Sequence, residues 1–120
     1  MNSKTGLDSL NEFLNSLVDY EKRLLESLGN INGLDDNCAL LFGDEVVKVD
    51  FRTAMIYQMR HGISHTIMKY ENYNNFISTI FMSVSVDGFH FETSLNGEIF
   101  KHETYSEAVE FHQNAVKNLL

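Results

Sequence analysis

The chain has 120 residues, 43% of them apolar, and carries nine Lys and Arg against 17 Asp and Glu, which gives a net charge of -8. A chain of this length can bury one hydrophobic core but not two, so we expect a single domain over residues 1–120. The acidic balance disfavours a groove that follows nucleic-acid phosphates, and direct nucleic-acid binding is not expected. The pattern indicates neither a membrane span nor a signal peptide, and the single cysteine fits a reducing compartment, so we predict a cytoplasmic protein.

Apolar residues recur at three- and four-residue spacing over residues 7–29, which predicts one long amphipathic N-terminal helix. Ser9 and Glu12 match a capping box at its start, and Asp8 is a rival cap. The apolar stripe can pack on the rest of the chain or pair with a second copy in a homodimer, because part of it keeps a seven-residue repeat. That repeat consists of Leu10, Leu17, Leu24 and Ile31.

The middle of the chain predicts three short elements. Residues 39–42 and 45–49 flank a Gly-Asp pair and suggest a small hairpin. Asp50 can cap a short helix over residues 51–61, and an alternating pattern over residues 64–71 predicts a strand.

Two turn signals set the register of the strands that follow. Asp87-Gly88 and Asn96-Gly97 suit two-residue type I′ turns, which place Val84 opposite Phe91 and Thr93 opposite Phe100. The inward face then holds Ile80, Met82, Val84, Val86, Phe89, Phe91, Leu95 and Phe100. The outward face holds Ser83, Ser85, His90, Glu92, Ser94, Lys101 and Glu103, with Phe81 and Ile99 at one end.

A second capping box, formed by Thr104 and Glu107, begins a C-terminal helix that should cross the inward face. The predicted fold is therefore α+β. An antiparallel meander of about four strands packs against the C-terminal helix, and a long N-terminal helix and a short middle helix complete the chain.

Residues 50–116 resemble small bacteriophage-encoded proteins of unknown function. The matching segments are ISTIFM at 77–82, FETSLNG at 91–97 and TYSEAVEFH at 104–112, and EVVKVDF at 45–51 is similar to the entry segment of that family. Phe111 replaces a small residue of the family pattern, and an insertion of the family is reduced to Asp87-Gly88. The resemblance implies a phage origin, an α+β core over residues 45–120 and a bacterial host cytoplasm. It raises the expectation of an anti-defence protein, such as an anti-CRISPR, by analogy.

Catalytic chemistry is not indicated by any motif. In the predicted register His90 lies opposite Glu103 and Glu92 lies opposite Lys101, so a His-carboxylate metal set is conceivable. Cross-strand charge pairing on a solvated face is the preferred interpretation, and we predict no metal and no cofactor. His112 is expected to be a buried, hydrogen-bonded histidine rather than a catalytic base. We therefore expect the chain not to be an enzyme.

The favoured hypothesis is an acidic protein that inhibits or modulates a host protein by binding it. A nucleic-acid-binding defence effector, such as a CRISPR nuclease, is the expected partner. The alternative is a homodimeric structural or regulatory phage protein joined through the N-terminal helix. Candidate partner-binding residues are Asp35, Asp36, Asp44, Glu45, Phe81, His90, Glu92, Ile99 and Glu103.

Overall fold

The computed structural model describes residues 4–28, 37–62, 65–85 and 87–119 and confirms the α+β class. The chain divides into two compact units. The N-terminal unit comprises residues 1–63 and 83–89, and the C-terminal unit comprises residues 64–82 and 90–120. One domain over the whole chain stays a prediction.

Two helices replace the single helix expected over residues 7–29. They are α1 (Gly6–Asn15) and α2 (Asp19–Leu28). At the break the Ser16 hydroxyl donates to the Phe13 carbonyl over 2.7 Å, and the Val18 N–H donates to the Glu21 carboxylate over 3.0 Å. These side chains take the place of helical backbone partners, so the chain turns and a new helix starts.

The N-cap of α1 lies one turn before the predicted cap, Ser9. Thr5, not Ser9, is the N-cap: its hydroxyl accepts from the Asp8 N–H over 3.1 Å, and the Asp8 carboxylate accepts from the Thr5 N–H over 3.0 Å. Both Thr5-Asp8 and Ser9-Glu12 have capping-box spacing, and the earlier pair is the one used.

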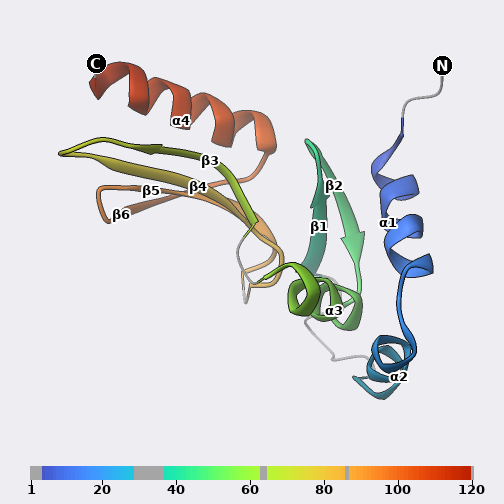
Figure 1. Cartoon of the computed structure of the whole chain (residues 1–120). Coiled ribbons are helices and arrows are strands. Elements are labelled where there is room, and N and C mark those ends of the chain that lie inside the picture. The colour runs from blue at the N-terminus through green and yellow to red at the C-terminus, as the bar shows by residue number, and fades with distance from the viewer. Residues whose placement is uncertain (1–3, 29–36, 63–64, 86, 120) are drawn as a thin grey trace. The chain divides into compact units, whose positions relative to one another are not determined.

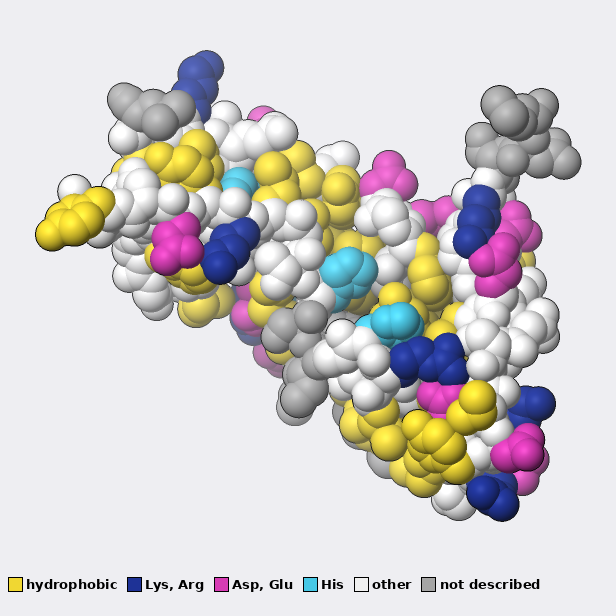
Figure 2. Space-filling view, in the orientation of Figure 1, with side chains coloured by type: hydrophobic (Ala, Val, Ile, Leu, Met, Phe, Trp, Pro, Cys, Tyr) yellow, Lys and Arg dark blue, Asp and Glu magenta, His cyan; other side chains and the backbone are white. Residues whose placement is uncertain are grey.

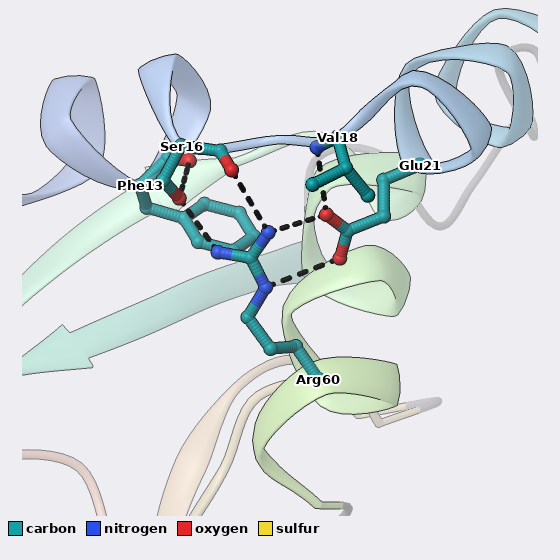
Figure 3. A network of polar contacts seen from close by, with 5 residues as sticks. All are labelled: Phe13, Ser16, Val18, Glu21 and Arg60. Carbon is teal, nitrogen blue, oxygen red and sulfur yellow. Dashed lines mark hydrogen bonds and ion pairs between the residues drawn. The ribbon is translucent and has the colours of Figure 1, made fainter.

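Arg60 of α3 (Phe51–His61) holds the break between α1 and α2 (Figure 3). Its Nε donates to Glu21 Oε2 over 3.1 Å, and its Nη2 donates to Glu21 Oε1 and, over 3.2 Å, to the Ser16 carbonyl. Its Nη1 donates to the Ser16 hydroxyl over 2.6 Å. Because Glu21 is buried, this bidentate pair supplies the charge partner that its carboxylate requires.

The pH dependence of stability should report this ion pair. The hydrogen bond from Arg60, followed by that from the Val18 N–H, holds the pKa of Glu21 below its ordinary value of 4.5. A carboxyl with a lowered folded-state pKa adds stability above its unfolded pKa and loses it as the pH falls through the folded pKa. We therefore expect the free energy of unfolding to fall less steeply below pH 4.5 in Arg60→Gln than in the wild type.

Urea unfolding at a series of acidic pH values measures this difference. Arg23→Gln is the matched control, because Arg23 is an exposed arginine of α2. Parallel pH curves for the wild type and Arg60→Gln would contradict the assigned role of Arg60.

The expected hairpin and middle helix are present in the N-terminal unit. β1 (Cys38–Phe42) pairs antiparallel with β2 (Glu45–Val49), and the Asp50 carboxylate caps α3 by accepting from the Thr53 N–H over 3.0 Å. The buried core of this unit contains Phe13, Leu17, Cys38, Leu40, Ala54 and Ile56. Leu10, Leu14, Leu24 and Leu25 pack against it, so the leucine stripe contributes to the core of its own chain.

The C-terminal unit is the predicted four-stranded antiparallel meander with α4 across one face (Figure 1). Its elements are β3 (His65–Glu71), β4 (Phe76–Met82), β5 (His90–Leu95), β6 (Glu98–His102) and α4 (Tyr105–Leu119). The Thr104 hydroxyl accepts from the Glu107 N–H over 3.1 Å at the start of α4, as the capping spacing predicts.

The turn at Asn96 and Gly97 is confirmed. Both residues have positive φ, 52° and 93°, as a type I′ turn requires. The predicted pairs across β5 and β6 are present, including Thr93 with Phe100 and Phe91 with His102.

The predicted turn at Asp87 and Gly88 is wrong. β4 and β5 pair with Phe81 opposite Phe91 and Thr79 opposite Thr93, three residues away from the expected register. Because three is odd, the side chains of β4 exchange faces. Phe81 lies on the face covered by α4, whereas Ile80 and Met82 lie on the other face, which we call the outer face.

The physical reason is that Ser83, Val84 and Phe89 leave the four-stranded sheet and bond to the start of β1. Ala39 N–H donates to the Ser83 carbonyl over 3.1 Å, and the Ser83 hydroxyl donates to the Ala39 carbonyl over 2.5 Å. The Phe89 N–H donates to the Asn37 carbonyl over 3.0 Å. Ser83, expected on the wet face, is consequently buried.

Candidate protein-binding face

The outer face of the four-stranded sheet carries apolar side chains where a solvated face is usually polar. Phe76 of β4 is 41% exposed and Ile99 of β6 is 54% exposed, and the half-buried Ile80 of β4 is on the same face. Figure 2 shows hydrophobic side chains at the molecular surface among polar and charged ones. Contiguous exposed apolar residues of this kind mark binding surfaces more often than scattered ones do.

The same residues form a shallow groove of about 200 Å³. Its lining consists of Phe76, Ser78, Ile80, Glu92, Ser94 and Ile99. Ser78 pairs with Ser94, and Ser94 pairs with Ile99, across three neighbouring strands. The two small serines therefore form a low floor, and the larger apolar side chains form its walls.

Glu92 of β5 lines this groove, and His90 precedes it by two residues on the same strand. His90 Nε2 and Glu92 Oε1 are 2.8 Å apart, and Glu92 is opposite Lys101 as predicted. Glu103 is exposed just beyond the end of β6. Within the described ranges, no three His, Cys, Asp or Glu side chains are grouped so that they could hold a metal ion.

Of the other candidate residues, Phe81 belongs to the C-terminal unit, and Asp44 and Glu45 belong to the N-terminal unit. Phe81, expected at the exposed end of the sheet, is buried beneath α4, because its pairing with Phe91 places it on the face that α4 covers. Asp44 is exposed in the turn of the β1–β2 hairpin, and the Glu45 carboxylate accepts from the Gly6 N–H. Asp35 and Asp36 lie outside the described residues.

A buried polar chain on the inner face was only partly foreseen. His112 Nδ1 lies 2.9 Å from Thr79 Oγ1, which lies 2.7 Å from Thr93 Oγ1. Thr93 Oγ1 is in turn 3.0 Å from His102 Nε2. His112 is 3% exposed and both threonines are fully buried, so the expectation of a buried, hydrogen-bonded His112 is confirmed.

Burial favours the neutral form of both histidines in this series of hydrogen bonds. Burial lowers the pKa of His112 below its ordinary value. Burial also lowers the pKa of His102, against the opposing effect of the Glu107 carboxylate. Each ring can then donate from one nitrogen and accept at the other. Thr79 and Thr93 meet because they pair across β4 and β5. The different register predicted for these two strands therefore concealed the buried polar chain.

No family model, curated protein or solved structure matches the chain. The resemblance to phage proteins therefore stays a prediction. In the part of the chain that the structure describes, no helix has both the length and the apolar character needed to cross a membrane.

Proposed function

We propose that the chain is a non-enzymatic binding protein that inhibits or modulates a basic host protein by covering part of its surface. The observation that carries this proposal is the apolar groove of the outer face, with Phe76 and Ile99 exposed on its walls. The phage resemblance adds the suggestion that the partner is a nucleic-acid-binding defence effector.

The groove has the features of an interface centre. Binding energy usually comes from a few apolar or aromatic anchors that a polar rim shields from water. Here the apolar anchors lie on β4 and β6, while Glu92, His90 and Lys101 supply polar groups beside them. An inserted side chain of a partner would contact Ile99 on one side and Phe76 on the other.

Charge favours a basic partner. The net charge of -8 attracts a positive surface from a distance and repels acidic competitors. The long-range part of this attraction is screened by salt. Binding through the groove should consequently combine a short-range apolar contact with an association rate that falls as the ionic strength rises.

Substitution within the groove tests this proposal. Wild-type chain, Ile99→Asp and the control Leu7→Asp are immobilised and exposed to bacterial lysate at low salt. Leu7 is 59% exposed on α1, so the control makes the same chemical change at an exposed site of the other unit. We expect a basic protein whose capture falls about tenfold with Ile99→Asp and not with Leu7→Asp.

The captured protein is then purified and its affinity for the three chains is measured at low salt and at about 0.5 M salt. Thermal melting of each variant establishes that it is folded. Equal affinity for the wild type and Ile99→Asp, or an affinity indifferent to salt, would contradict the proposal.

The structure adds no observation in favour of the homodimer alternative. The leucines that would join two copies, Leu10, Leu17 and Leu24, lie in or against the core of the N-terminal unit. Ile31, the fourth residue of the repeat, lies outside the described residues. We therefore do not adopt a homodimer as the proposed function.

A further inference from the structure

A second groove lies within the C-terminal unit, between β3 and α4. Its volume is about 380 Å³, which is in the range of small-molecule sites. The residues that line it include Met68, Lys69, Tyr70, His112, Val116 and Lys117. None of them belongs to the groove of the outer face.

The polar side chains that line this groove are those of Lys69, Tyr70, His112, Gln113 and Lys117. Every buried side-chain nitrogen or oxygen of the described residues has a hydrogen-bond partner, and His112 uses Nδ1 for Thr79. Its second nitrogen, Nε2, is the one left for a ligand in the groove that the ring lines. Lys117 contributes an ammonium group, whereas the ammonium group of Lys69 lies 3.6 Å from Glu71 and 5.5 Å from the Phe76 ring centroid.

Lys117 is one of few positively charged side chains in the C-terminal unit. The C-terminal unit contains three lysines and no arginine against six glutamates. Lys117 makes no ion pair with any described residue. An acidic unit thus presents a cation beside Met68 and Val116, an arrangement that suits an anion with an apolar body.

The buried polar chain behind His112 can be polarised to match an anion. If His112 donates its Nε2–H to a ligand oxygen, Nδ1 accepts from the Thr79 hydroxyl, and Thr79 accepts from the Thr93 hydroxyl. Thr93 then accepts from His102 Nε2–H. Each hydroxyl donates once and accepts once, so no member is left unsatisfied.

We propose that this groove binds a small carboxylate with an apolar body. Lys117 and the Nε2–H of His112 hold the carboxylate, and Met68, Val116 and the Tyr70 ring contact the apolar part. Burial lowers the pKa of His112, which favours the neutral ring that accepts the hydrogen bond from Thr79.

Octanoate is the probe that tests this site, and 1-octanol is its uncharged control of equal length. Both are titrated into full-length chain with ¹³C-labelled methionine methyl groups. We expect octanoate to shift the Met68 signal with a dissociation constant of about 0.1–1 mM. The exposed Met59 of α3 should not move and so controls for non-specific association.

Two variants assign the charge. Lys117→Gln should weaken octanoate about five- to tenfold, and 1-octanol should bind the wild type more weakly by a similar factor. Lys101→Gln, on β6, should leave octanoate binding unchanged. The absence of a shift in the Met68 signal, or equal binding of octanoate by the wild type and Lys117→Gln, would overturn the proposal. Ile99→Asp should retain octanoate binding, so this test is independent of the outer face.

Discussion

Phe81→Ala is expected to lower the free energy of unfolding by about 3–5 kcal/mol, because it removes a large side chain from a closed core. Phe81 is 1% exposed, and its ring centroid lies 5.0 Å from that of Phe91 on the neighbouring strand. The surrounding sheet and α4 leave little freedom to fill the resulting cavity. Urea unfolding followed by circular dichroism measures the loss.

Ile80→Ala is the matched control for this experiment. Ile80 adjoins Phe81 in the sequence but lies on the outer face, where it is half-buried. Its substitution should cost about 1 kcal/mol. A larger loss for Ile80→Ala than for Phe81→Ala would restore the face assignment predicted from the Asp87-Gly88 turn and contradict the observed register.

Thr79→Val should cost about 1–3 kcal/mol although it preserves the shape of the side chain. The change deletes the hydroxyl that joins His112 to Thr93, and both partners then lose a hydrogen bond inside the core. A buried polar group without a hydrogen-bond partner lowers the stability of the folded state. The free energy of unfolding at pH 7 and the ¹⁵N shifts of the His112 ring report the loss.

Thr66→Val makes the same chemical change on β3, where the side chain is exposed, and should leave stability within about 0.5 kcal/mol. If Thr79→Val were as neutral as Thr66→Val, the buried polar chain would have no role in stability. An unchanged ¹⁵N shift at His112 would point to the same conclusion.

Features with local sequence signals were predictable. The helix between Asp50 and Gly62 and the turn at Asn96 and Gly97 each depend on residues within a few positions, and both are confirmed. The failures involve distant partners. Arg60 joins Glu21 across 39 positions, and Ser83 joins Ala39 across 44 positions, so no local pattern could reveal the arginine that holds the helix break or the departure from the sheet.

The face assignment failed for a related reason. β4 has apolar residues on both sides, with Ile77 and Phe81 inward and Ile80 outward, so alternation alone does not select a face. Thr79 is polar and yet fully buried, which opposes the usual pattern. Ile99, His90 and Glu92 were placed correctly on the outer face because the Asn96-Gly97 turn fixes β5 and β6 independently of β4.

The pairing of Ser83, Val84 and Phe89 with the start of β1 has a consequence for synthesis and for protein engineering. The chain builds most of its N-terminal unit, enters the C-terminal unit at residue 64, and then returns for seven residues before completing the second unit. On the ribosome, the N-terminal unit therefore cannot finish its pairing until residue 89 has emerged, after β3 and β4 have been made. A gene divided between residues 63 and 64 separates β1 from Ser83, Val84 and Phe89, with which it pairs. The two units therefore cannot be exchanged as separate segments of the gene.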